Sequence, residues 1–77
     1  MTPIKEANRP FDVGLQLLIK AKGLKQLYVA EKAGYTPQEL SDMLNGRRLI
    51  KACDIPRLAS AIGATMDEVY KVGEQTT

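Results

Sequence analysis

The chain has 77 residues, of which 44% are hydrophobic and 26% are charged. This length and balance are typical of one small soluble globular domain and exclude a disordered or fibrous chain. A chain this short buries only about 60% of the surface that its unfolded form exposes. We therefore expect a core made almost entirely of helices or of one tight sheet, and dimerisation would add to that core.

The residue types that are missing exclude most enzyme chemistry. The sequence contains no His, which removes Ser-His and Cys-His nucleophile pairs and His-ligated metal sites. Cys53 is the one Cys, so no internal disulfide can form, which fits a reducing compartment. No Gly-rich phosphate loop or cluster of carboxylates suggests another reaction. We expect no enzymatic activity, no metal ion and no cofactor.

Hydropathy and charge indicate where the protein acts. No apolar run approaches the roughly 18 residues that a membrane span needs, and residues 1–10 lack the apolar stretch of a signal peptide. We therefore expect a cytoplasmic protein without a membrane partner. Residues 1–57 hold ten Lys or Arg and six Asp or Glu, whereas residues 58–77 hold one and three. This positive bias suits a polyanion, and it equally suits ordinary solvated helix faces.

Glycines recur at short intervals and predict where helices end, because glycine adopts left-handed backbone without a steric penalty. Together with the apolar periodicity they predict an all-α fold of five short helices. Residues 12–73 form the expected domain, and residues 1–11 and 74–77 are expected to be a loosely ordered arm and tail. The expected helices run from Asp12 as N-cap to Lys22, from 25 to 33, from Thr36 to Asn45-Gly46, from 54 to 63, and from Thr65 through Tyr70.

The third helix has the clearest start. Thr36 can serve as its N-cap, Pro37 fits the first helical position, and Glu39 completes a Thr-x-x-Glu capping box. A structural role for Glu39 at this cap is therefore favoured over contact with a ligand. Thr65 to Glu68 form a second box of the same kind at the last helix.

The second and third helices form a recognisable pair across a four-residue turn. Such a pair needs a small residue at the crossing, here Ala30, and a glycine in the turn, here Gly34. The run Lys-Gln-x-x-Val-Ala-x-x-Ala-Gly-Tyr-Thr-x-x-x-Leu-Ser-x-x-Leu-Asn from residue 25 resembles the helix-turn-helix of the Cro and lambda-type repressor family, which are XRE-type transcriptional regulators. The resemblance continues without a gap from about Leu15 to Tyr70 and implies a compact lambda-repressor-like fold.

This resemblance implies a sequence-specific regulator that binds double-stranded DNA, a repressor of phage, prophage or bacterial type. Such a protein would act as a homodimer and associate with the nucleoid of a bacterial host. Two alternatives stay open: a helical domain without DNA binding, and an antitoxin-like or antirepressor-like module that binds another protein through the same helices. No small-molecule ligand is expected, because so small a core leaves little room for a pocket.

The resemblance also implies roles for individual residues. It places the third helix in the major groove, where Gln38 can pair with adenine N6 and N7 and Asp42 can accept from cytosine N4. Arg47 and Arg48 are expected to contact phosphates, although they could instead be ordinary solvent-exposed residues of a loop. The base-reading positions are Pro37, Gln38, Ser41 and Asp42, and the phosphate-contacting positions are Lys25, Gln26, Asn45, Arg47, Arg48 and Lys51.

The last helix is the expected dimer surface, although its apolar residues could instead close the core of the monomer. Leu27 and Tyr28 lie where the family usually has polar surface, and we expect them to extend the core, with a contact to the arm or to a partner as alternatives. The dimer residues would be Met66, Val69, Tyr70 and Val72.

One departure from the family pattern predicts a packing contact. Many members pair an Arg on the first helix with a Glu just before the Asn-Gly, and the matching positions here are Ile19 and Leu44. A well-packed apolar pair can replace a buried ion pair at little cost in stability. We therefore expect these two side chains to touch.

Overall fold

A computed structural model describes residues 3–76 of the chain. The described residues form six α-helices and no strand, so the predicted all-α fold is confirmed. The predicted number of five helices is wrong, because Ile4–Ala7 form an additional short helix. The helices are α1 (Ile4–Ala7), α2 (Phe11–Ala21), α3 (Gln26–Ala33), α4 (Pro37–Leu44), α5 (Asp54–Ala61) and α6 (Met66–Thr76).

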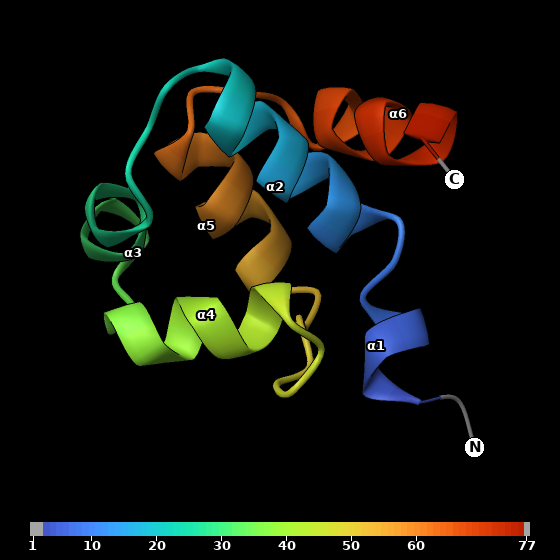
Figure 1. The fold of residues 1–77 in the computed structure, drawn as a ribbon, viewed down its shortest axis with the longest axis horizontal. Coiled ribbons are helices and arrows are strands. Elements are labelled where there is room, and N and C mark those ends of the chain that lie inside the picture. The colour runs from blue at the N-terminus through green and yellow to red at the C-terminus, as the bar shows by residue number, and fades with distance from the viewer. Residues whose placement is uncertain (1–2, 77) are drawn as a thin grey trace.

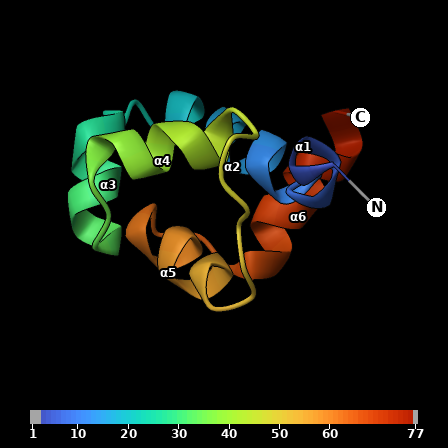
Figure 2. The ribbon, with the colours of Figure 1, turned by 90° about the horizontal axis from the view of Figure 1, so that it is seen from below.

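The helices surround one apolar core. α2 packs against both α6 and α4, and α3 packs against both α4 and α5 (Figure 1). α1 and α6 lie at the same end of the molecule (Figures 1 and 2). The largest fully buried side chains come from α2 to α6 and are Leu15, Val29, Leu40, Met43, Leu58 and Val69.

Two glycines allow α2 and α6 to approach closely. A Cβ on Gly14 would lie 1.9 Å from the carbonyl oxygen of Val69, and a Cβ on Gly73 would lie 2.0 Å from that of Pro10. The rings of Phe11 and Tyr70 meet beside this contact, with centroids 5.3 Å apart. The backbones of the two helices therefore touch at Gly14 and Gly73, which joins the start of α2 to α6.

This packing corrects the expected arm and tail. Residues 3–11 are not loosely ordered, because they include α1, the buried side chain of Asn8 and the start of α2. Asp12 is not an N-cap: α2 begins at Phe11, which is buried in the core, and Asp12 is buried within the first turn. α6 continues to Thr76, so residues 74–76 are helical rather than a tail. Residues 1, 2 and 77 lie outside the described residues.

Two further expectations about apolar side chains are wrong. Leu27 and Tyr28 do not extend the core: they are 54% and 48% exposed, because α3 turns the face of Val29, Ala30 and Ala33 inward. Val69 cannot line a dimer surface, because it is fully buried in the monomer.

Two other residues of the expected dimer surface are more accessible than Val69. Tyr70 is half-buried against Phe11, and Met66 is exposed. Ile19 and Leu44 are both buried in the core and line the same pocket between α2 and α4. The shared pocket agrees with the predicted apolar pair, and direct contact between the two side chains stays a prediction.

The helix contact at Gly14 yields a stability prediction. Gly14→Ala should lower the free energy of unfolding by about 1 to 3 kcal/mol, because the added methyl group meets the backbone of α6 and outweighs the higher helix propensity of Ala. Urea unfolding followed by circular dichroism measures the change. Lys71→Ala, on an exposed position of α6, is the control and should change stability by less than about 0.5 kcal/mol. If Gly14→Ala were more stable than wild type, α2 and α6 could shift apart without loss of stability, and the prediction would be wrong.

Candidate nucleic-acid interface

The turn between α3 and α4 has the predicted geometry. Ala30 is fully buried where the helices cross, and Gly34 ends α3 with a left-handed φ of +88°. The N–H of Tyr35 then donates to the carbonyl of Ala30 at 2.8 Å. Since an L-residue is strained at this φ, the glycine determines how sharply the chain turns into α4.

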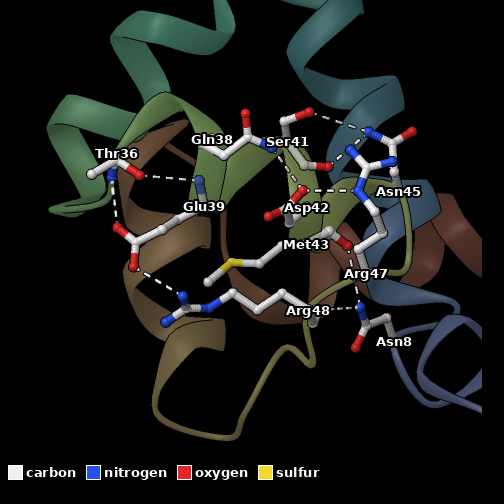
Figure 3. Close-up of polar contacts among 10 residues, drawn as sticks. All are labelled: Asn8, Thr36, Gln38, Glu39, Ser41, Asp42, Met43, Asn45, Arg47 and Arg48. Atoms are coloured by element: carbon white, nitrogen blue, oxygen red, sulfur yellow. Dashed lines mark hydrogen bonds and ion pairs between the residues drawn. The ribbon is translucent and has the colours of Figure 1, made fainter.

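The capping box of α4 is complete (Figure 3). The N–H of Glu39 donates to Oγ1 of Thr36 at 3.1 Å, and the N–H of Thr36 donates to Oε1 of Glu39 at 2.8 Å. The bond from the Thr36 backbone is also the main reason why the pKa of Glu39 lies below its ordinary value. The predicted structural role of Glu39 is confirmed.

The packing of α4 decides which residues it presents outward. Leu40, Met43 and Leu44 form its buried stripe. Gln38 on the opposite side is exposed, and Ser41 and Asp42 are half-buried. In the view of Figure 2, no other described segment lies in front of α4. The helix therefore offers an outward face that a large partner can reach.

Both acidic residues on α4 are paired with arginines that follow it (Figure 3). Nε of Arg47 lies 2.9 Å from Oδ1 of Asp42, and a guanidinium nitrogen of Arg48 lies 2.9 Å from Oε2 of Glu39. The backbone explains the pairing, because the N–H groups of both arginines donate to the carbonyl of Asp42. The chain thus folds back over the end of α4.

Asp42 has a second partner on its own helix. Nε2 of Gln38 donates to Oδ1 of Asp42 at 2.9 Å. The hydrogen bond from Arg47, followed by the one from Gln38, holds the pKa of Asp42 below its ordinary value. Sequence reasoning placed all three residues at the interface but missed their mutual contacts. The spacing of four residues between Gln38 and Asp42 was an available signal.

Asn8 is the main residue supporting this interface that sequence reasoning missed. Its side-chain amide donates to the carbonyls of Met43 at 3.2 Å and Arg48 at 2.9 Å, and its Oδ1 accepts from the N–H of Ile50 at 2.8 Å. These bonds fasten the loop after α4 to the chain just after α1 (Figure 3). No periodicity marked this lone Asn, because its role arises from contacts about 40 residues away.

The loop also carries Asn45 and Gly46. The Asn45 amide donates to the carbonyl of Ser41 at 2.7 Å, and Gly46 has a left-handed φ of +78°. A Cβ on Gly46 would lie 2.9 Å from Cβ of Lys5, so α1 rests directly against the loop. The N-terminal helix therefore supports the segment that holds Arg47 and Arg48.

The start of α3 forms a second part of the interface. Lys25 is its N-cap, and its side chain makes no capping hydrogen bond, so the first N–H groups of the helix keep their capacity to bind an anion. Gln26, the first helical residue, is exposed. It lines a pocket of about 380 Å³ with Asn45 and Lys20, so the predicted phosphate contacts at α3 and at the end of α4 lie close together.

Asp54 connects the turn to α5. Its carboxylate accepts from the hydroxyl of Tyr35 and from the N–H of Lys51. Burial by itself raises the pKa of Asp54, but these two hydrogen bonds prevail and lower it. Lys51, the last predicted phosphate contact, is exposed in the loop before α5.

This arrangement of two short helices across a glycine turn agrees with a comparison against known families. The sequence matches the helix-turn-helix family over residues 15–69. The chain belongs to the XRE-type helix-turn-helix family. This membership supports a DNA-binding transcription regulator rather than an enzyme.

Comparison with solved structures gives the same fold. The regulator of the clp gene from C. glutamicum, ClgR, superposes with a TM-score of 0.84 at 20% sequence identity, over 92% of each chain. No protein of curated function matches the sequence significantly. Among the described helices, none combines the length and hydrophobicity required to cross a membrane.

The Asn8 network yields a prediction for the loop after α4. Asn8→Ala should lower the free energy of unfolding by roughly 1 to 3 kcal/mol, because it leaves a buried N–H and buried carbonyls without partners. Chemical unfolding measures this loss. Asn45→Ala removes an exposed amide of the same type and should cost less. If wild type and Asn8→Ala were equally stable, the hydrogen bonds of Asn8 would not stabilise the loop.

The Tyr35 contact yields a pH prediction. Burial, then the hydrogen bond and charge of Asp54, raise the pKa of Tyr35 from 10 to about 12. A raised pKa means that the folded state holds the phenol proton more tightly, so this stabilisation is complete below pH 10 and is lost as the pH rises towards 12. Tyr35→Phe should be less stable than wild type by about 1 kcal/mol at pH 8.

The difference in unfolding free energy between wild type and Tyr35→Phe should therefore shrink between pH 10 and 12. Unfolding curves of both proteins across this range provide the measurement. The other tyrosines are present in both proteins and cancel in the comparison. A difference that stays constant with pH would show that the Tyr35 proton does not contribute.

Proposed function

We propose that the protein is a sequence-specific regulator of transcription, a repressor of phage, prophage or bacterial type, that inserts α4 into the major groove of double-stranded DNA. The observation that carries this proposal is the outward face of α4, which presents polar side chains beside phosphate-binding donors at the start of α3 and in the loop after α4. A major groove is wide enough for one helix, and donors beside that helix can bind the phosphates along the edge of the groove.

The base-reading role falls to the exposed side of α4. Gln38 carries an amide that can bind a base edge, and Ser41 carries a hydroxyl that can donate or accept. Pro37, at the first helical position, offers an apolar contact of the kind that suits a thymine methyl group. Asp42 shares this face, but its Oδ1 already accepts from two donors.

The phosphate-contacting role falls to two places. At the start of α3, the free N–H groups bind a phosphate with the help of Lys25 and Gln26. At the loop after α4, Asn45, Arg47 and Arg48 bind the next phosphates, with Lys51 beyond them. Arg48 is paired with Glu39 in the free protein and exchanges this partner for a phosphate oxygen on binding. Arg47 keeps its Nε on Asp42 and binds phosphate through its other guanidinium N–H groups.

The functional unit in this proposal is a cytoplasmic homodimer, associated with the nucleoid in a bacterial host, that reads a near-palindrome with half-sites roughly 34 Å apart. Support comes from the corner between α5 and α6, where Met66 is 47% exposed and borders an apolar pocket. The dimer contact is proposed at Met66, Tyr70 and Val72, without the buried Val69.

A second candidate function is a protein-interaction module. Two acidic residues on α4, together with the exposed pair Leu27 and Tyr28 on α3, favour this alternative. Dependence on salt separates the two functions. DNA affinity falls by about one power of the salt concentration for each phosphate contact, whereas a mainly apolar protein contact responds weakly.

Selection of bound sequences from random duplexes at moderate salt tests the proposal directly. We expect a palindromic consensus, and we expect titrations of that duplex at increasing salt to give a log-log slope of several units. The consensus would establish the function, and its symmetry would establish the dimer. No affinity for any duplex at low ionic strength would reject the regulator and leave the interaction module.

Two substitutions separate base reading from phosphate binding. Gln38→Ala should relax the base preference at one position of the consensus and cost about 1 to 3 kcal/mol of binding free energy on the preferred site. Arg48→Ala should weaken binding to all duplexes alike, because a phosphate contact carries no sequence information. Binding to the consensus and to a scrambled duplex measures both effects. Equal losses on the two duplexes for Gln38→Ala would remove Gln38 from the readout.

A further inference from the structure

We propose that Asp42 is a positioning residue that makes Gln38 selective for adenine, by taking one N–H of its amide. This inference rests on the proposed function and goes beyond it by giving Asp42 a role: its contact with Gln38 makes that residue read adenine rather than guanine. It also replaces the expected contact between Asp42 and cytosine, because Asp42 acts here through Gln38 rather than on a base.

The orientation of the Gln38 amide follows from the chemistry of its partner. An ionised carboxylate can only accept hydrogen bonds, so the amide must present its nitrogen to Asp42. The structure shows this contact, with Nε2 of Gln38 at 2.9 Å from Oδ1 of Asp42 (Figure 3). The alternative orientation would set the amide oxygen against the carboxylate, which is repulsive.

Arg47 holds the Asp42 carboxylate in place and in its ionised form. Its Nε donates to the same Oδ1 at 2.9 Å, from the loop after α4. The two hydrogen bonds lower the pKa of Asp42, so the carboxylate stays ionised at neutral pH and remains an acceptor. The carboxylate is thus held from two sides, by its own helix and by the loop that Asn8 fastens.

The hydrogen-bonding groups that remain on Gln38 determine which base it can bind. One N–H is used by Asp42, which leaves one N–H donor and the carbonyl acceptor. Adenine presents one acceptor, N7, and one donor, N6, in the major groove. Guanine presents two acceptors there, so the carbonyl oxygen of Gln38 would face an acceptor and only one hydrogen bond could form. The arrangement therefore favours adenine over guanine.

The second acidic residue of α4 provides a matched control. Glu39 also lies on α4 and also pairs with an arginine of the loop, but its carboxylate binds the cap rather than Gln38. Glu39→Gln keeps an oxygen for the capping box and removes the same unit of negative charge as Asp42→Ala. Both variants free one arginine, so they share the electrostatic effect and differ in the contact with Gln38.

The test uses two duplexes that differ only at the position that Gln38→Ala relaxes, one with adenine and one with guanine. Wild type should prefer adenine by about 5-fold to 150-fold. Asp42→Ala should reduce this ratio by at least about fivefold, because the freed amide can turn its nitrogen towards guanine. Glu39→Gln should keep the wild-type ratio. Fluorescence anisotropy titrations of both duplexes with the three proteins give the ratios.

The outcomes distinguish the inference from the function beneath it. An unchanged ratio in Asp42→Ala, or a wild-type preference for guanine, overturns the inference while leaving DNA binding intact. An equal loss of the ratio in Glu39→Gln also overturns it, since the effect would then be one of charge. Failure of wild type to bind any duplex rejects the proposed function, and the inference with it.

A measurement without DNA tests the contact itself. The two side-chain N–H signals of Gln38 in an NMR spectrum of the free protein should be well separated, because one proton is bonded to Asp42. In Asp42→Ala they should move towards the positions of a solvated amide, and in Glu39→Gln they should stay. Unchanged Gln38 signals in Asp42→Ala would overturn the inference whatever the DNA results, and an unchanged backbone spectrum would show that the fold is kept.

Discussion

The left-handed turn at Gly34 is the constraint on which the rest of the interface depends. With φ at +88°, the chain leaves α3 sharply enough for α4 to begin two residues after Tyr35 and to pack its apolar stripe on the core. Ala30 permits the close crossing, and the Thr36–Glu39 capping box fixes where α4 starts. Because the start and the buried stripe of α4 are determined in this way, helical periodicity makes Gln38, Ser41 and Asp42 face away from the core.

The charge on this face is balanced internally. Each acidic residue of α4 is paired with an arginine of the following loop, so the two carboxylates do not present unpaired negative charge to a polyanion. Such exposed pairs contribute little to stability, and they can therefore exchange partners at low cost. The arrangement keeps the side chains of α4 oriented while leaving the arginines available for phosphate.

The N-terminal segment belongs functionally to the same surface. Asn8 satisfies backbone groups on both sides of the loop after α4, and α1 approaches Gly46 too closely for any side chain there. α6 in turn covers the start of α2 through the contacts of Gly14 and Gly73. The N-terminal segment thus supports a loop in the middle of the chain, and α6 supports the helix that follows this segment.

The sequence by itself determined the all-α class, the glycine turn, the capping box of α4 and the set of residues on its outward face. These follow from local rules: a glycine where φ is positive, a Thr and a Glu three residues apart, and apolar residues at helical spacing. Only the tertiary structure decided that Val69 is buried, that Leu27 and Tyr28 are exposed, and that residues 3–11 are ordered by Asn8. It also decided that the charges of Asp42 and Arg47 meet. These outcomes depend on contacts between segments far apart in the chain or across a turn, and neither periodicity nor residue type specifies which partner a side chain will meet.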